Sequence, residues 1–196
     1  CGEGFDRSSL RLLGDQEKLI SAVASTEKPL VVVYIQGRTM NMNLAAEKAQ
    51  ALLTAWNPGE QGGMGIADIL FGDYRPAGRL PVSVPRSEGQ LPVFYSQGTQ
   101  RDYVESKGTP LYGYGLSYTR FTYSGLELQK GTEMETLQTV ACTVTNTGNR
   151  DGEEVVQLYI GDKVASVSQP PLLLKAFQRI FLKKGESRQV IFHLKK

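Results

Sequence analysis

Hydrophobic positions in the first part of the chain alternate between two patterns, which predict helices and buried strands in turn. Asp15 can cap a helix that carries Leu19, Ile20 and Val23 on one face. The uninterrupted apolar run at residues 30–35 predicts a parallel strand that is covered on both faces. The alternation then repeats, with a short helix at residues 43–49, a second buried strand at 51–56 and a helix at 61–71. This order predicts a doubly wound α/β layer, although a complete sheet would need more strands.

The pattern changes in the second half of the chain. Residues 75–115 are dense in Gly, Pro and Tyr, which favours irregular structure with short extended pieces such as residues 80–84. Beyond this region Val140, Cys142 and Val144 alternate with polar or small residues, so they should share the inner face of a strand. Further strands are predicted at residues 155–160, 176–182 and 189–194. About five strands are visible after residue 120, fewer than the roughly seven of an immunoglobulin-like sandwich, so this part is expected to be truncated.

These patterns predict two domains and a connector. We expect a partial doubly wound α/β sandwich domain at residues 1–85 and a connector at 86–120. An incomplete immunoglobulin or fibronectin III-like β-sandwich should follow at 121–196, so the fold class is α/β plus all-β. The first four residues, Cys-Gly-Glu-Gly, are typical of the exit of a strand whose body is absent. We therefore expect the chain to be a segment of a longer polypeptide.

Composition and charge exclude several classes of partner. The 196 residues are 40% hydrophobic and 21% charged, which is typical of a folded protein. The net charge of +2 is spread without a basic run, so neither nucleic acid nor an anionic membrane is an expected partner. The longest apolar stretch, residues 29–35, is far too short to span a bilayer. Cys1, Cys142 and the single His193 have no metal-ligand spacing, so no metal site is expected.

Short motifs occur in a fixed order along the chain. They are GEGFDR at residues 2–7, GDQ at 14–16, KPLVVV at 28–33, AWNPG at 55–59, IADILFGD at 66–73 and GRLPV at 78–82. Together they resemble the second domain of family 3 glycoside hydrolases. GYGLSY at residues 113–118 is similar to that family's entry into a fibronectin type III-like domain, and VTNTG at 144–148 and KAF at 175–177 extend the similarity. The resemblance therefore covers almost the whole chain.

The resemblance implies that Glu3 is the general acid/base of a retaining glycosidase. It also implies an N-terminal (β/α)8 barrel, absent here, that carries the nucleophilic aspartate and most sugar contacts. The residues around Glu3 agree with this role, because Gly2 and Gly4 leave the backbone free to turn and present the carboxyl to a cleft. A retaining enzyme needs such a second carboxyl about 5–5.5 Å from its nucleophile. The alternative is a solvated loop glutamate.

Three neighbours of Glu3 are further candidates for the site. In similar enzymes an aromatic residue at the position of Phe5 lies beside the aglycone, where its flat face can pack on a sugar or aryl ring, but Phe5 could equally pack in the core. Asp6 and Arg7 could reach the same cleft. An ion pair between them that positions the loop is the stronger expectation.

The predicted function is that of an exo-acting β-glycosidase that removes a terminal β-linked sugar with retention and without a cofactor. A β-glucosidase is favoured and a β-xylosidase is the second choice, because the pocket that separates them would lie on the absent barrel. The chain alone, without that N-terminal barrel segment, is expected to be inactive. The rival from another class is a non-catalytic carbohydrate-binding or adhesion module. The resemblance implies a periplasmic or secreted protein, and the oligomeric state is left open, with a homo-oligomer as one option.

Overall fold

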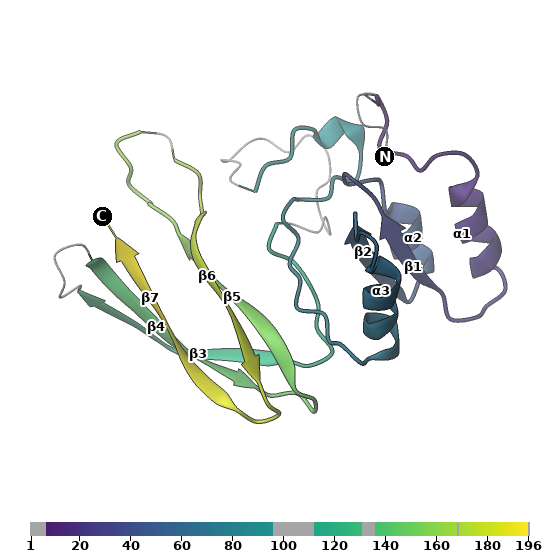
Figure 1. Ribbon diagram of the computed structural model, residues 1–196. Coiled ribbons are helices and arrows are strands. Elements are labelled where there is room, and N and C mark those ends of the chain that lie inside the picture. The colour runs from purple at the N-terminus through teal and green to yellow at the C-terminus, as the bar shows by residue number, and fades with distance from the viewer. Residues whose placement is uncertain (1–6, 96–111, 131–135, 168, 196) are drawn as a thin grey trace. The chain divides into compact units, whose positions relative to one another are not determined.

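The computed structural model describes residues 7–95, 112–130, 136–167 and 169–195 (Figure 1). These residues form two units. The α/β unit contains the described residues up to Asp73, together with residues 81–95 and Tyr112. The sandwich unit contains residues 74–80 and the described residues from Gly113 onward. The predicted class, an α/β part followed by an all-β part, is confirmed.

The α/β unit follows the predicted order of helices and strands. Its elements are α1 (Gln16–Ala24), β1 (Val31–Ile35), α2 (Asn43–Lys48), β2 (Ala51–Trp56), α3 (Gly62–Phe71) and the 3-10 helix η1 (Glu88–Gln90). The strands β1 and β2 pair in parallel from Val31 opposite Ala51 to Tyr34 opposite Thr54. Asp15 stands at the N-cap of α1, but its backbone angles, φ −96° and ψ 17°, are not those of the extended capping conformation. Its carboxylate pairs with Lys18 Nζ at 2.8 Å instead of capping the helix.

The α/β unit has one hydrophobic core, and several apolar side chains of β1 and α3 lie outside it in contact with solvent. The core contains Ile20, Tyr34, Met40 and Ala45, which are contributed by α1, β1, α2 and the loop between β1 and α2. Because side chains alternate along a strand, the neighbours of Tyr34 point away from this core. Ile35 is 66% exposed, and on α3 Phe71 is 84% exposed. The expectation that both strands are buried on both faces is therefore wrong for the described residues, in which the sheet has two strands.

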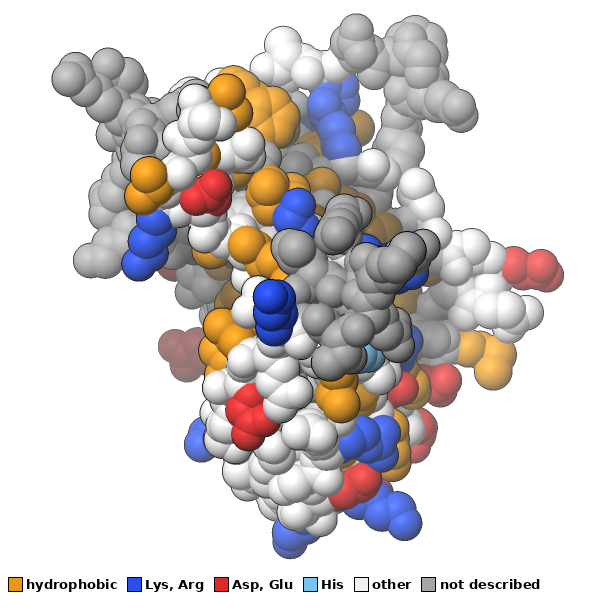
Figure 2. Space-filling model, turned by 90° about the vertical axis from the view of Figure 1, so that its left-hand side faces the viewer, with side chains coloured by type: hydrophobic (Ala, Val, Ile, Leu, Met, Phe, Trp, Pro, Cys, Tyr) orange, Lys and Arg blue, Asp and Glu red, His pale blue; other side chains and the backbone are white. Residues whose placement is uncertain are grey.

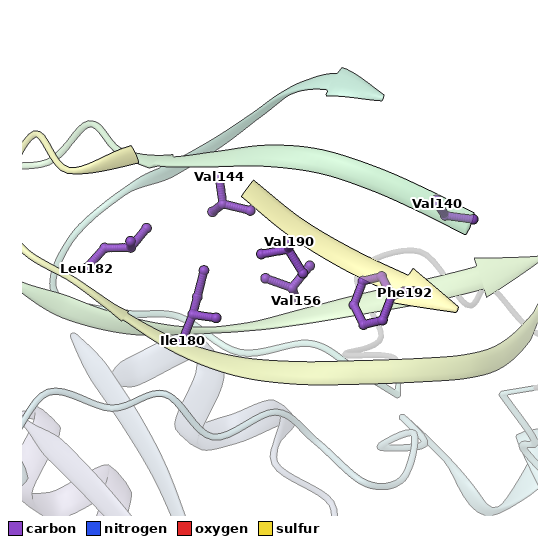
Figure 3. Packing of buried hydrophobic residues seen from close by; sticks show 7 residues of the cluster. All are labelled: Val140, Val144, Val156, Ile180, Leu182, Val190 and Phe192. Atoms are coloured by element: carbon purple, nitrogen blue, oxygen red, sulfur yellow. The ribbon is translucent and has the colours of Figure 1, made fainter. Parts of the chain in front are cut away.

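The sandwich unit consists of two antiparallel sheets. Strands β3 (Phe121–Lys130), β4 (Thr136–Asn146) and β7 (Ser187–Lys195) form one sheet, and β5 (Gly152–Ile160) and β6 (Leu173–Leu182) form the other. Figure 3 shows the buried side chains between them: Val140, Val144, Val156, Ile180, Leu182, Val190 and Phe192. Cys142 packs against this cluster but is only partly buried, and burial raises the pKa of its thiol. The predicted inward face of β4 is confirmed, with Cys142 less enclosed than its two neighbours.

A segment of the connector region packs on the sandwich sheets. We call residues Tyr74–Leu80 the strap. Its Arg79 Nη2 donates to Glu154 Oε2 of β5 at 2.5 Å, and Tyr123 Oη of β3 donates to Glu154 Oε1 at 2.8 Å. The side chains of Arg79 and Glu154 are only 13% and 10% exposed, so this ion pair is shielded from water. Burial, followed by the neighbouring carboxylate, raises the pKa of Tyr123 and keeps its hydroxyl a donor.

A second, more exposed cluster holds the start of the strap. Tyr74 Oη donates to Glu153 Oε2 at 2.5 Å, and Arg179 of β6 pairs with the same carboxylate. At the other end of the strap, Leu80 N–H donates to Tyr114 O and Gly113 N–H donates to Leu80 O, each at 2.8 Å. Residues 74–80 thus belong with the sandwich and 81–95 with the α/β unit. Side-chain pairing, which no periodic pattern marks, fixes the path of residues 74–80. The described residues 75–95 contain no strand, in keeping with the irregular structure expected there, and the domain bounds at residues 85 and 120 stay predictions.

The surface of the chain carries both signs of charge. On the face shown in Figure 2, Lys and Arg side chains are interspersed with Asp and Glu rather than gathered into one basic patch.

The buried Arg79–Glu154 pair predicts that the strap stabilises the sandwich unit. Arg79→Met leaves a buried carboxylate unpaired and should lower the free energy of unfolding of this unit by about 3 kcal/mol. Arg179→Met is the matched control, because the Arg179 side chain is 52% exposed and its ion pair with Glu153 should contribute less than about 1 kcal/mol.

Each unit offers its own probe for this test. In a Cys1→Ser background, the rate of Cys142 labelling reports opening of the sandwich, while fluorescence of Trp56, the sole tryptophan, reports the α/β unit. Arg79→Met should accelerate the labelling and leave the Trp56 transition in place. If Arg79→Met and Arg179→Met accelerated Cys142 labelling equally, the buried Arg79–Glu154 pair would not be what stabilises the sandwich unit.

Candidate functional site

Of the four predicted site residues, one is described by the structure. Glu3, Phe5 and Asp6 lie outside the described residues, so their roles and the Asp6–Arg7 ion pair stay predictions. Arg7 is half-buried, and its Nη2 donates to the carbonyl of Arg11 at 3.0 Å. The described part of the candidate site is therefore Arg7, the last residue of the GEGFDR motif, and the residues that follow it.

This segment, Ser9–Arg11, is held by a carboxylate from a distant part of the sequence, and we call it the anchored segment. Glu88 Oε1 accepts the Leu10 N–H at 2.8 Å and the Ser9 hydroxyl at 3.0 Å. The Ser9 hydroxyl oxygen in turn accepts the Arg11 N–H at 3.1 Å. The Leu10 side chain is 7% exposed, so apolar packing fixes the same point.

Further contacts reach the anchored segment from α1 and from the loop after β1. Asn41 N–H donates to Leu10 O at 2.7 Å, and Arg38 Nη2 donates to Ser9 O at 3.3 Å. Arg11 Nη2 pairs with Glu17 Oε2 of α1 at 2.7 Å. The segment is thus tied to three separate parts of the α/β unit.

Glu88 is itself positioned by polar contacts around η1. The side-chain amides of Asn41 and Asn43 both donate to Arg86 O at 2.9 Å, and Arg86 N–H donates to Gln90 Oε1 at 2.6 Å. These bonds seat residues 86–90 against the loop before α2 and present the Glu88 carboxylate to the anchored segment. Sequence reasoning missed Glu88, Asn41 and Asn43.

A buried amide marks the carboxyl end of β1. Gln36 is 5% exposed, and its N–H donates to Trp56 O at 3.0 Å. Neither polar atom of its side chain has a hydrogen-bond partner in the structure, which is uncommon for a buried amide. Open α/β sheets bind ligands at this edge. The side chain of Gln36 is therefore a buried polar group for which the described residues supply no hydrogen-bond partner.

Comparison with known proteins decides the family. Residues 1–118 match the Glycosyl hydrolase family 3 C-terminal domain, and residues 154–196 match a Fibronectin type III-like domain. The chain belongs to glycosyl hydrolase family 3. The resemblance read from the GEGFDR-to-GRLPV motifs is confirmed.

The relatives within family 3 are glycosidases. The chain is 42% identical to a periplasmic beta-glucosidase of Salmonella typhimurium, over 97% of this chain and 27% of the relative. It is 42% identical to a beta-xylosidase of Formosa agariphila, over 99% of this chain and 28% of the relative. The chain thus spans about a quarter of the length of these relatives.

Solved structures agree with the fold. A b-glucosidase from Erythrobacter marinus superposes with a TM-score of 0.90 at 42% identity, over 97% of this chain and 26% of that protein. The beta-glucosidase from Listeria innocua in complex with glucose gives 0.88 at 35% identity, over 99% of this chain and 29% of that protein. Both structures support the fold class, an α/β part followed by a β-sandwich.

The described residues contain neither a metal cluster nor a helix that could span a membrane. No group of three or more His, Cys, Asp or Glu side chains in the described ranges could hold a metal ion. None of the helices in this part of the chain has the length and apolar composition that crossing a membrane requires.

Electrostatics at the anchored segment of this family 3 chain favour an ionised Glu88. The hydrogen bond from the Leu10 N–H is the main cause that lowers the pKa of Glu88, with smaller contributions from its own backbone N–H, the Ser9 hydroxyl and the Arg11 charge. The hydrogen bond from Arg11 likewise lowers the pKa of Glu17. The anchor is therefore fully formed at neutral pH.

This shift predicts a pH dependence of the anchored segment. A carboxyl whose pKa is lower in the folded than in the unfolded state stabilises the fold above its ordinary pKa, about 4.3 for Glu. The contribution is lost as the pH falls through the lower folded value. The protection factor of the Leu10 amide, measured by NMR hydrogen exchange, should therefore decrease below about pH 4.

Glu88→Gln is the control, because a side-chain amide does not titrate. In that variant the Leu10 protection factor should show no decrease specific to Glu88, and any remaining decrease should come from Glu17. The Leu19 amide, which donates to Asp15 O in α1 at 2.9 Å, reports general unfolding of the unit. If the protection factors of Leu10 and Leu19 fell together as the pH is lowered, the whole unit would be unfolding, which would contradict a local release of the anchored segment.

Proposed function

We propose that this chain is the C-terminal part of a retaining exo-β-glycosidase, a β-glucosidase in first place and a β-xylosidase in second, and that Glu3 is its general acid/base. The observation that carries the proposal is the GEGFDR motif of the family at residues 2–7, which leads directly into an anchored segment at Ser9–Arg11. The relatives' names, periplasmic beta-glucosidase and beta-xylosidase, favour an enzyme over a non-catalytic module. The periplasmic relative also supports a periplasmic or secreted location.

The reaction proceeds in two steps that both use Glu3. In the first step the Glu3 carboxyl protonates the departing glycosidic oxygen while an aspartate on the N-terminal barrel attacks the anomeric carbon. In the second step the Glu3 carboxylate removes a proton from water while the water oxygen attacks the anomeric carbon and the bond from that carbon to the aspartate breaks, which releases the sugar with its β configuration. Phe5 packs on the aglycone, and Asp6 and Arg7 hold the loop. The two carboxyls suffice for this chemistry, so no cofactor takes part.

The N-terminal segment of the same polypeptide is the proposed partner of the α/β unit. The side chains of Ile35 on β1 and of Met64 and Phe71 on α3 are each exposed, and a longer parallel sheet or a neighbouring domain would cover them. The unpartnered side-chain amide of Gln36 directly follows Ile35 at the end of β1, and a polar group of that N-terminal segment would bond to it. The chain on its own lacks the nucleophile and should be inactive.

The proposal predicts a specific defect for Glu3→Ala in the full-length enzyme. Glycosides with poor leaving groups should lose turnover by about 10²–10⁴-fold, the usual range for general acid catalysis, whereas activated aryl glycosides should form the glycosyl-enzyme almost normally and then release it slowly. Azide needs no general base. Added azide should therefore restore turnover of the activated substrate.

The product identifies the mechanism. NMR of the rescued reaction should show a β-glycosyl azide, as double displacement requires. An α-glycosyl azide would indicate a single displacement. Unchanged kinetics in Glu3→Ala would show that Glu3 is not the acid/base and would favour the alternative, a solvated loop glutamate.

A further inference from the structure

The outer face of β6 carries aromatic side chains. Because alternate residues of a strand share a face, Phe177 and Phe181 point away from the core that contains Ile180 and Leu182. The residues Phe177 and Phe181 are 68% and 47% exposed. Antiparallel sheets that pack one face on a core normally turn polar residues toward water on the other face. The exposed phenylalanines of β6 therefore mark a candidate interaction surface.

The outer face of the opposite sheet shows the ordinary polar pattern. On β4 and β7 it carries hydroxyl and imidazole groups that bond to each other. Thr139 Oγ1 lies 3.2 Å from His193 Nδ1. Thr145 Oγ1 lies 2.8 Å from Ser187 Oγ, and Ile191, which is 44% exposed, is an apolar side chain on this face. The two outer faces of the sandwich thus differ in their chemistry.

The outer face of the β5–β6 sheet already binds other segments on its β5 side. Tyr74 of the strap donates to Glu153, which lies directly opposite Phe181 in the ladder. Gln157 Nε2 donates to Gly113 O at 3.2 Å, and a Cβ atom at Gly113 would lie 2.6 Å from Gln157 Oε1. Two segments that precede β3 therefore pack closely on β5, and the phenylalanines of β6 continue the same surface.

The charges between the two phenylalanines are balanced. Arg179 lies between them on β6 and pairs with Glu153, and Phe177 lies opposite the neutral Gln157. We call Phe177, Arg179 and Phe181 the aromatic face. A partner would meet aromatic rings and a neutralised ion pair there. This composition fits an apolar protein surface, because the cores of protein interfaces are enriched in aromatic residues and Arg and contain few uncompensated charges.

We infer that the aromatic face docks on the N-terminal segment of the same polypeptide, so that this segment holds the sandwich unit as well as the α/β unit. The inference rests on the proposal that the chain is the C-terminal part of a longer enzyme. The chain matches 27% and 28% of two glycosidase relatives, so about three quarters of their length lies outside the match. A segment of the same polypeptide is present at a high effective concentration, which favours it over separate partners.

Hydroxyl-radical footprinting of the full-length enzyme and of the 196-residue chain tests whether the face is covered. Trypsin separates the two phenylalanines into the peptides 176–179 and 180–183, so the oxidation of each is measured separately. Residues at the core of an interface are fully buried, so oxidation of Phe177 should be at least about fivefold slower in the full-length enzyme. Ile191 on the opposite outer face is the matched control, and its oxidation rate should be the same in both proteins.

A substitution tests whether this contact stabilises the sandwich unit. In the full-length enzyme Phe177→Ser should accelerate labelling of Cys142 by about 5–30-fold, the range expected when a buried aromatic side chain is lost from an interface. In the 196-residue chain, where Phe177 is exposed, the labelling rate should change less than about twofold. Ile191→Ser should change the rate equally in both proteins.

Other occupants give different results, and each of these results would overturn the inference. Equal oxidation of Phe177 in the full-length enzyme and in the 196-residue chain would show that the N-terminal segment does not cover the face. Slower oxidation of the chain at higher protein concentration would assign the face to a second copy. Protection that requires a soluble β-glucan would make the face a glycan-binding surface.

These results are independent of the Glu3→Ala kinetics. Protected Phe177 together with unchanged kinetics in Glu3→Ala would support the docking surface and contradict the acid/base role of Glu3. Exposed Phe177 together with azide rescue of Glu3→Ala would contradict the docking surface and support the acid/base role.

Discussion

A carboxylate that is withdrawn from water must be paired inside the protein, and Glu154 imposes this constraint on the sandwich unit. An unpaired buried carboxylate costs several kcal/mol. Glu154 meets its partners in Arg79, on the strap, and in Tyr123, on β3. The strands of the sandwich supply only the Tyr123 hydroxyl, so without Arg79 the Glu154 carboxylate would have no positively charged partner. The sandwich of this chain therefore includes a segment that precedes its first strand by about forty residues in the sequence.

Hydrogen bonds and ion pairs to carboxylates also fix the path of the segment between α3 and residue 95. This segment has one turn of 3-10 helix and no strand, so side chains rather than a backbone ladder fix its path. Arg79 ties its first part to β5, and Glu88 ties its second part to Ser9 and Leu10. Each half thereby becomes part of a different unit. An irregular segment can thus serve as structure for the sandwich and as support for the residues that follow the GEGFDR motif.

The periodicity of apolar residues predicted the helices and strands well, but it predicted less well which of their faces are buried. The helix expected at residues 61–71 is α3, Gly62–Phe71, and the inward alternation of Val140 and Val144 on β4 is confirmed. Burial of Ile35 was wrong because the described sheet has two strands, and a pattern of apolar residues does not say which chain segment covers them. The Glu88–Leu10 bond joins residues 78 positions apart, and no local pattern marks either partner. The family motif located the candidate site, but the contacts that hold the residues after it come from distant parts of the sequence and required the structure.

In the proposed enzyme the acid/base Glu3 belongs to this chain and the nucleophile to another part of the polypeptide. A 2-deoxy-2-fluoro β-glycosyl fluoride tests this division directly, because the fluorine slows hydrolysis of the covalent intermediate and leaves the nucleophile labelled. Digestion and mass spectrometry of the labelled full-length enzyme should place the sugar on an aspartate outside these 196 residues. A sugar attached to a carboxylate within them, Glu3 included, would contradict the account.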